Sequence, residues 1–344
     1  MKRFLVSILI MVMVCAAVPG SLAEQPNAAG SPLPVKVLIL PKFEVETLEG
    51  DFPGEAQYYY EAYLADAEAF DVPHGAPGTK LYYKDGVALC VLGMGKVNAA
   101  LTTMAILSDA RFDYSQAYIL STGCAGSAAE TTVMGDVFLI TAAVDYDLGH
   151  HADGRDLADP EEISWFHNAD FDEAAVVILN QALAEKAYAL VKDTPVETTE
   201  RTRNYMLHAF DGAAWAVRDP LVLTGTTVTG DNYWKGAHGH ANALRMVETY
   251  GCPDPYVTTE MEDVAVARAA QWMGLLDRLI VIRGSVNMDV FMVGATPESL
   301  WSDAENMTLA VEDSVEAADI FPVSMKNNFN VGRVIIDSIL SGEF

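Results

Sequence analysis

Carboxylate groups follow several apolar stretches of this sequence. Residues 43–46 (FEVE) follow the apolar run 36–40 after Pro41 and Lys42, and residues 260–262 (EME) follow another predicted strand. Late in the chain, Asn287 and Asp289 follow the apolar run 279–283. Carboxylates accept hydrogen bonds from hydroxyl groups, and a buried carboxylate with a raised pKa can take a proton from water. These residue types predict a site that binds hydroxyl-bearing ligands or performs acid–base chemistry.

Glycine-containing segments lie at other predicted strand ends. They are residues 93–95 (GMG), 121–126 (STGCAG) and 229–233 (TGDNY). The first of these departs from the dinucleotide-binding pattern G-x-G-x-x-G, because Asn98 stands at the third glycine position. We expect a tight strand-to-helix turn at residues 93–95, and a cradle for a phosphate group is the alternative.

Strands and helices are predicted to alternate along the chain. Strands are expected at residues 36–40, 86–92, 117–121, 136–144, 221–229 and 279–283. Helices are expected at residues 54–67, 97–108, 174–191, 262–272, 297–317 and 331–340. Strands without polar alternation are buried on both faces. The pattern therefore predicts an α/β fold with a mixed central sheet between helical layers, and ligands of such folds bind beyond the carboxyl ends of strands.

The N-terminus has the layout of a secretory signal peptide. Lys2 and Arg3 precede an apolar run over residues 4–18, and small residues close the segment at Ala23. That run is shorter than the ~20 residues of a membrane-spanning helix, although an uncleaved anchor is the alternative. We expect a signal peptide at residues 1–23, a linker at 24–34 and a single domain at 35–344. The mature chain is then exported and soluble, either periplasmic or extracellular.

Composition limits the partners of the chain. The formal net charge is −27, and loss of Lys2 and Arg3 with the signal peptide lowers it to −29. A field of that sign argues against nucleic acid and anionic lipid as partners. Cys90, Cys124 and Cys252 remain after cleavage, an odd number that predicts no disulfide framework. We expect Cys90 and Cys124 to be thiols within the core.

The motifs taken together resemble one group of proteins. Residues 92–103 (LGMGKVNAALTT), 121–126, 229–233 and 260–262 are similar, in this order, to segments of nucleoside phosphorylases and nucleosidases. Residues 145–151 (DYDLGHH) and 230–234 (GDNYW), with the signal peptide, resemble the purine nucleoside permease family from residue 35 to the C-terminus. The resemblance implies a nucleoside phosphorylase-like fold, in three α/β/α layers whose mixed central sheet is partly barrel-like.

The resemblance also implies roles for particular residues in binding. Glu262 would accept hydrogen bonds from the ribose hydroxyls, and Met261 would pack under the sugar. Tyr233 would stack on the purine ring. The backbone amides of Thr122 and Gly123 would line the base or the sugar.

The match is weaker for catalysis. Asn287 stands where nucleosidases have an Asp that protonates purine N7; an amide donates a hydrogen bond there but cannot deliver a full proton. Such an Asn favours 6-oxopurines, and Asp289 is a substitute acid. Glu46 matches the glutamate that activates water in nucleosidases, although a surface position is equally compatible with its surroundings.

Further ligands and partners are less supported. No Arg stands at the positions that hold phosphate in phosphorylases, so phosphate is not expected as a cosubstrate. His150 and His151 have acidic neighbours, but adjacent strand residues point to opposite faces, which favours a polar rim over a metal site. We expect no cofactor and no metal. Related folds form oligomers, so a homo-oligomer is expected, and uptake would require a membrane transport partner.

Two functions are compatible with these features. The first is an exported purine nucleoside-binding protein that serves nucleoside uptake. The second is an enzyme that cleaves the N-glycosidic bond of purine nucleosides, by hydrolysis rather than phosphorolysis. A relative that has lost catalysis and acts as an interaction module is a third reading.

Overall fold

The computed structural model describes residues 31–152, 164–296 and 316–344, with the side chains of residues 316–319 excluded. The described residues from position 32 to the C-terminus form one compact unit. The predicted signal peptide and residues 24–30 of the linker lie outside the described residues. The predicted helix at 297–317 also lies outside them, except for its last two residues.

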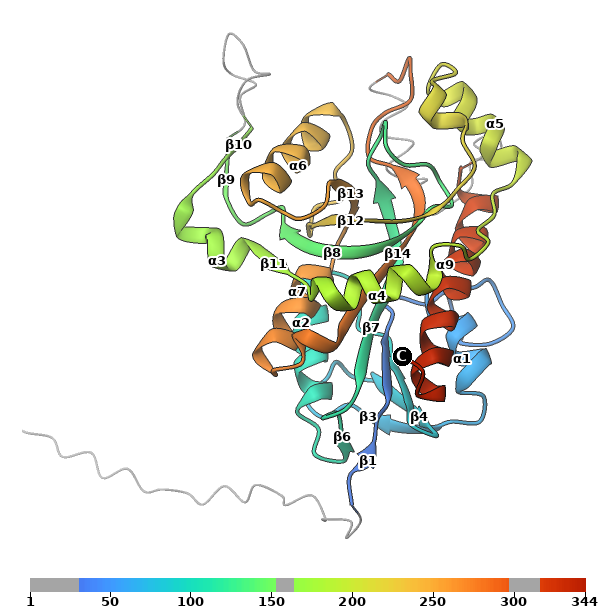
Figure 1. The fold of residues 1–344 in the computed structure, drawn as a ribbon, viewed down its shortest axis with the longest axis vertical. Coiled ribbons are helices and arrows are strands. Elements are labelled where there is room, and N and C mark those ends of the chain that lie inside the picture. Colours follow the sequence, from blue (N-terminus) through green and yellow to red (C-terminus); the bar gives the residue numbers. More distant parts are fainter. Residues whose placement is uncertain (1–30, 153–163, 297–315) are drawn as a thin grey trace, which may run out of the picture. The chain divides into compact units, whose positions relative to one another are not determined.

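A mixed ten-stranded sheet forms the centre of the described fold (Figure 1). Its strands are β2 (Val37–Leu40), β3 (Glu68–Asp71), β4 (Lys80–Lys84), β5 (Val87–Cys90), β7 (Tyr118–Ser127), β8 (Val137–Asp145), β11 (Val176–Ile178), β12 (Val222–Thr229), β13 (Tyr256–Glu260) and β14 (Leu279–Met288). The order is β11-β8-β12-β13-β7-β2-β5-β4-β3, and β14 pairs with both β7 and β8. Strands β8, β12, β13, β7 and β14 therefore close into a ring, which confirms the partly barrel-like sheet. Short pairs join β1 (Leu33–Pro34) to β6 (Phe112–Asp113) and β9 (His150–His151) to β10 (Trp165–Phe166).

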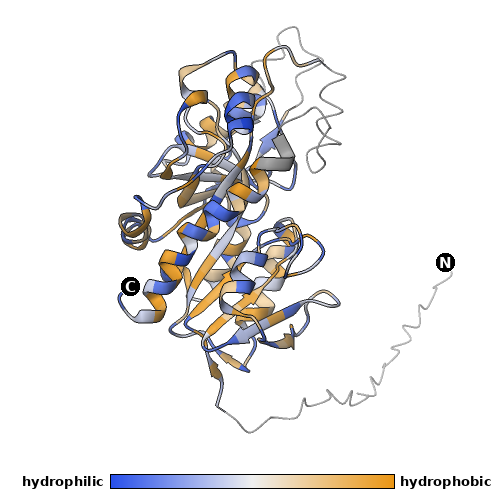
Figure 2. Cartoon of the chain, turned by 90° about the vertical axis from the view of Figure 1, so that its right-hand side faces the viewer, coloured by the Kyte–Doolittle hydropathy of each residue, from blue (hydrophilic) through white to orange (hydrophobic). Residues whose placement is uncertain are grey.

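Helices cover both faces of this sheet, as predicted for three layers (Figures 1 and 2). They are α1 (Gln57–Tyr63), α2 (Lys96–Leu107), α3 (Asp172–Ala175), α4 (Gln181–Val191), α5 (Glu200–Ala209), α6 (Ala237–Thr249), α7 (Asp263–Trp272) and α9 (Glu316–Ser341). A hydrophobic core lies on each face of the sheet, and the side chains of β2 point alternately into the two. Leu38 and Leu40 pack with α2 and α7, whereas Val37 and Ile39 pack with α1, α4 and α9. Both faces of the strand are thus buried, which explains its unbroken apolar sequence.

The prediction of one helix at residues 174–191 is wrong. The segment contains the end of α3, strand β11 and helix α4. Val176, Val177 and Ile178 are β-branched, and β11 pairs antiparallel with β8. Asn180 then caps α4 by accepting a hydrogen bond from the backbone N–H of Leu183. The last helix, α9, is longer than the predicted range 331–340.

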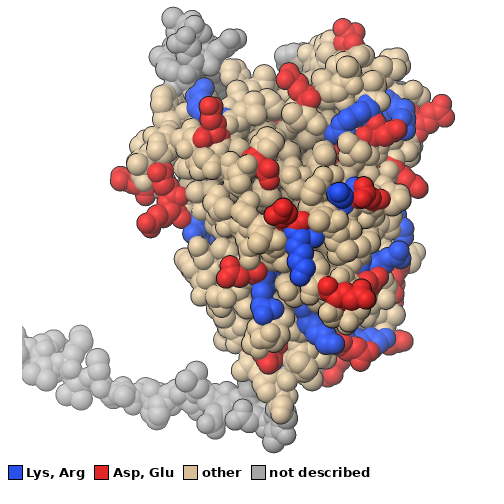
Figure 3. All heavy atoms as spheres, viewed as in Figure 1, with Lys and Arg blue, Asp and Glu red and all other residues tan. Residues whose placement is uncertain are grey.

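Acidic and basic side chains alternate over the face seen in Figure 3, without a broad basic patch. Within the described part of the chain, no helix combines the length and the apolar character needed to cross a membrane.

Candidate functional site: a buried carboxylate–arginine cluster

Five charged side chains meet where several strands end. Lys42 follows β2, Glu260 ends β13, Glu262 and Asp263 lie at the start of α7, and Arg283 lies within β14. We call these five residues the carboxylate–arginine cluster. Each is at most 6 % exposed. Charged side chains are rarely buried to this degree unless they pair with one another, and here the neighbouring strand ends supply the partners.

Arg283 holds the cluster together. Its Nε donates to Asp263 Oδ2 over 2.7 Å, and its Nη2 donates to Glu260 Oε2 over 2.8 Å. Its Nη1 donates to the carbonyl oxygen of Cys124 over 2.8 Å. The planar guanidinium thus has partners on three sides, which fixes its orientation against the site.

Lys42 adds a second buried cation. Its Nζ lies 3.4 Å from Asp263 Oδ1 and donates to Ser121 Oγ over 2.7 Å. Burial acts to raise the pKa of Asp263, but the charges of Arg283 and Lys42 outweigh it and lower that pKa to about 2. Asp263 is therefore a fixed negative charge at neutral pH.

Glu260 positions the start of α7. Its Oε2 accepts hydrogen bonds from the backbone N–H groups of Glu262 and Asp263, at 2.7 and 2.8 Å. Its Oε1 accepts a hydrogen bond from the hydroxyl of Thr229. Burial, together with the nearby Asp263 carboxylate, raises the pKa of Glu260 to about 7. Glu260 is thus a structural acceptor whose hydrogen bonds orient the segment that carries Glu262.

The Glu262 carboxylate keeps unused capacity to accept hydrogen bonds. Its Oε1 accepts the backbone N–H of Gly95 over 2.9 Å, and its Oε2 lies 3.3 Å from Arg283 Nη2. Each carboxylate oxygen keeps a further lone pair, so the group can accept two hydroxyl donors. Burial raises the pKa of Glu262, against the opposing effect of Arg283. Gly95 has φ +88°, which favours glycine and confirms the predicted tight turn at residues 93–95.

Tyr233 and Asn287 lie beside each other, near Cys124. Tyr233 is 53 % exposed, and its hydroxyl end lies near Asn287 and Cys124. Burial of this hydroxyl raises the pKa of Tyr233. Asn287 is half-buried, and a Cβ atom at Gly126 would lie only 3.2 Å from its Nδ2. The exposed ring and the neighbouring amide offer a stacking surface next to a hydrogen-bond donor.

The other predicted binding residues are placed less directly. Thr122 is fully buried and its side chain turns toward α9, where its hydroxyl donates to Asn328 Oδ1 over 2.5 Å. Gly123 lies against the carboxylate of Glu55, and a Cβ atom there would be 2.5 Å from Glu55 Oε1. Met261 is half-buried between Glu260 and Glu262. Cys124, expected in the core, is only half-buried and borders Tyr233 and Glu55.

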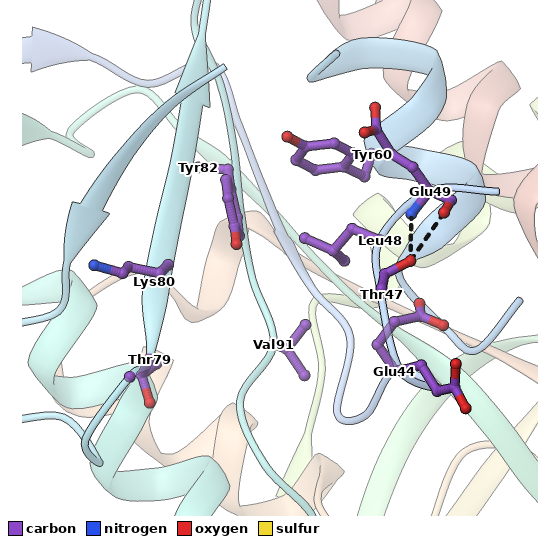
Figure 4. A pocket seen from close by; sticks show the side chains of 11 residues that line it. Glu44, Thr47, Leu48, Glu49, Tyr60, Thr79, Lys80, Tyr82 and Val91 are labelled. Carbon is purple, nitrogen blue, oxygen red and sulfur yellow. Dashed lines mark hydrogen bonds between the residues drawn. The ribbon is translucent and has the colours of Figure 1, made fainter. Parts of the chain in front are cut away.

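Glu46 lies apart from the carboxylate–arginine cluster. It is exposed, in a loop with φ +54°, and lines a separate pocket of about 740 Å³ between that loop and β4. Figure 4 shows Leu48, Tyr60 and Tyr82 around this pocket. Of the two positions that the sequence allowed for Glu46, the structure shows the exposed one.

Asp289 is also drawn into a different set of contacts. Its Oδ1 accepts the backbone N–H of Ala129 over 3.0 Å, and its Oδ2 lies 2.7 Å from His240 Nδ1 and 2.9 Å from the hydroxyl of Tyr256. The side chain is fully buried. Asp289 thus holds His240 in place.

Glu55 is a site residue that the sequence reasoning missed. It is 5 % exposed, and its carboxylate accepts backbone N–H groups from Lys42 and Cys124. The chain turns back between residues 43 and 55, since the Glu55 N–H donates to the Phe43 carbonyl. Lys42 was missed as well, although a lysine directly after a buried strand is a usable signal.

The two adjacent histidines lie in β9, and both are exposed. His151 Nε2 lies 2.7 Å from the Tyr146 carbonyl oxygen. Across the described ranges 31–152, 164–296 and 316–344, no group of three or more His, Cys, Asp or Glu side chains is arranged to hold a metal ion.

Comparison with known proteins identifies a family and several relatives of this chain. The family model described as purine nucleoside permease matches residues 34–343. A probable purine nucleoside permease of Schizosaccharomyces pombe is 26 % identical over 273 residues, which cover 72 % of this chain and 74 % of that protein. A 5′-methylthioadenosine/S-adenosylhomocysteine nucleosidase of Staphylococcus carnosus is 32 % identical over 127 residues, which cover 36 % of this chain and 51 % of that protein.

Solved structures share the fold. A nucleosidase of the same kind from Streptococcus pneumoniae, in complex with 8-aminoadenine, has a TM-score of 0.54 at 15 % identity and covers 88 % of this chain and 99 % of its own. A futalosine hydrolase of Helicobacter pylori has a TM-score of 0.53 at 15 % identity and covers 88 % of this chain and 98 % of its own. These similarities confirm the predicted nucleosidase- and phosphorylase-like fold.

Proposed function

Because the chain belongs to the purine nucleoside permease family, we propose that it is an exported purine nucleoside-binding protein that serves nucleoside uptake. The observation that carries the proposal is the placement of Glu262. This carboxylate is buried, is oriented by Gly95 and Arg283, and retains acceptor capacity for two hydroxyl groups.

The ribose would bind at Glu262. Its 2′ and 3′ hydroxyls are adjacent donors, and a fixed carboxylate is complementary to such a pair. A ligand that lacks one hydroxyl leaves a buried acceptor unpaired, and that loss gives the site its selectivity for a ribose over a deoxyribose. Met261, half-buried next to Glu262, would contact the sugar.

The base would bind between Tyr233 and Asn287. The exposed ring of Tyr233 offers a flat surface for stacking. The Asn287 amide is a hydrogen-bond donor for purine N7. The preference for 6-oxopurine nucleosides such as inosine and guanosine rests on the resemblance to phosphorylases that use an Asn in this role. Phosphate, metal and other cofactors have no role in this binding mode.

The role in uptake rests on the N-terminal sequence and on the family. Residues 1–23 have the layout of a signal peptide, which would deliver the chain to the periplasm or the cell exterior. A binding protein there would hand its nucleoside to a membrane partner. A homo-oligomer is compatible with this role.

Cleavage of the N-glycosidic bond is the alternative function. The arrangement of Glu262, Arg283 and Asn287 around one site favours it, as does the similarity to a nucleosidase sequence. Glu55, rather than the exposed Glu46, is the buried glutamate beside the site and the candidate to orient water. In this reading Asn287 stabilises the departing base by a hydrogen bond to N7.

Incubation of the purified protein with inosine, guanosine or adenosine, followed by chromatography, separates the two functions. Intact nucleoside, together with a saturable calorimetric titration, is the result expected of a binding protein. Free base in phosphate-free buffer would establish the hydrolase instead, and Glu262→Gln should then abolish its release while the exposed control Glu248→Gln should not. If the protein neither binds nor cleaves any of these nucleosides, the proposal is overturned.

A further inference from the structure

Three backbone N–H groups of the site converge on one side chain of the protein. The Glu55 carboxylate accepts the N–H of Lys42 over 2.7 Å, that of Phe43 over 3.4 Å and that of Cys124 over 2.8 Å. Lys42 and Phe43 follow β2, whereas Cys124 lies in β7, so the donors come from two neighbouring strands. Such converging amides form a binding site for an anion, and here the anion is a carboxylate of the chain itself.

The space for this carboxylate is created by a glycine. A Cβ atom at Gly123 would lie 2.5 Å from Glu55 Oε1 and 2.8 Å from Oε2. A larger residue at position 123 would displace the carboxylate from the three amides. Gly123 therefore allows the backbone of β7 to approach an anion closely, as glycines of phosphate-binding loops do.

Other amides at the site are occupied in the same way. The N–H of Gly95, in the glycine turn, donates to Glu262, and the next N–H, that of Lys96, donates to Asp231 Oδ1 over 2.8 Å. All five of these backbone N–H groups therefore already have an internal carboxylate partner. A second anion placed beside Glu55 would also face the charge of Glu262.

We propose that Glu55 is an internal substitute for inorganic phosphate: its carboxylate fills an anion cradle made by the N–H groups of Lys42, Phe43 and Cys124 and excludes phosphate from the site. Removal of the carboxylate uncovers a phosphate-binding site. The inference deepens the proposed nucleoside site and rests on it for its functional meaning, since a site closed to phosphate leaves only binding or hydrolysis.

The test measures phosphate binding alone, without nucleoside. Thermal midpoints of the full-length wild type, Glu55→Ala and the exposed control Glu46→Ala are compared in phosphate and in chloride at equal ionic strength. Glu55→Ala should be destabilised, because it leaves buried N–H groups unpaired, and phosphate should restore part of the loss. A midpoint rise of roughly 3 °C is expected at about ten times the dissociation constant of phosphate. Wild type and Glu46→Ala should not respond.

Two results would overturn the proposal. One is saturable binding of phosphate to the wild type in calorimetry, because the cradle would then not exclude it. The other is a folded Glu55→Ala variant whose midpoint responds to phosphate no more than that of Glu46→Ala. If the alanine variant does not fold, Glu55→Ser replaces it, because the serine hydroxyl can still accept one hydrogen bond. The phosphate titration of the wild type tests the proposal in either case. Because no nucleoside is present, the phosphate test does not depend on whether the protein binds nucleosides.

Discussion

Asp289 Oδ2 lies 2.7 Å from Nδ1 of His240, and this pair joins the end of β14 to the first turn of α6. The backbone reinforces the junction, since the N–H of Gly236 donates to the carbonyl of Asp289 over 2.7 Å. The loop that carries Tyr233 leads directly into this turn. The pair therefore anchors one wall of the candidate site without belonging to it.

The pair makes stability depend on pH. The hydrogen bond to Asp289, followed by the charges of Asp289 and Glu130, raises the pKa of His240 above 6.5, although burial opposes the shift. A folded-state pKa above the unfolded value stabilises the protein fully below the unfolded pKa, and this contribution is lost as pH rises through the folded pKa. The stability advantage of wild type over His240→Gln should therefore shrink as the pH rises through the range above about 6.5.

Chemical denaturation at several pH values measures this difference. His238→Gln is the matched control, because His238 is exposed in the same turn of α6 and should leave the pH profile unchanged. An advantage of wild type over His240→Gln that stays constant across this range would contradict the assignment.

Tyr233 should contribute to affinity through its ring. Tyr233→Ala should weaken inosine binding about 10- to 100-fold, the usual effect of losing a base–aromatic stack. Tyr233→Phe keeps the ring and should bind within about threefold of wild type. Because Tyr233 is 53 % exposed, neither variant should greatly alter the thermal midpoint. Equal losses of affinity in both variants would show that the hydroxyl, and not the ring, binds the nucleoside.

Asn287 should recognise purine N7. Wild type should prefer inosine over 7-deazainosine, which lacks the N7 acceptor, by about tenfold, as expected for one buried hydrogen bond. Asn287→Ala should bind the two nucleosides equally, as competition titrations would reveal. A preference for inosine that persists in Asn287→Ala would assign N7 recognition to another residue.

The layers of the fold were predictable because the strong apolar strands are buried on both faces. The side chains of residues 37–40 alternate between two hydrophobic cores, so the whole strand is apolar. Such apolar runs can be recognised from the sequence alone. Residues 174–191 were not predicted correctly, because Ala-rich helical sequence surrounds the short β-branched stretch of β11. That stretch is a strand only through its pairing with β8, a contact distant in sequence.

The binding part of the site was easier to predict than the acid–base part. Glu262 and Arg283 follow or lie within recognisable strands, and the structure brings them together. Glu46 and Glu55 both follow β2 in the sequence. Which of the two is buried depends on the reversal of chain direction between Phe43 and Glu55. Spacing along the sequence carries no information about that reversal. The contacts of Asp289 could not be predicted either, because its partner, His240, lies 49 residues away in the sequence.

The central claim is that Glu262 binds the ribose of a purine nucleoside. Calorimetric titration of wild type, Glu262→Gln and the exposed control Glu248→Gln with inosine and 2′-deoxyinosine tests it most directly. Wild type and the control should bind inosine at least about tenfold more tightly than 2′-deoxyinosine, and Glu262→Gln should lose most of this preference together with affinity. Equal affinity of the wild type for the two ligands, or an unchanged preference in Glu262→Gln, would contradict the account.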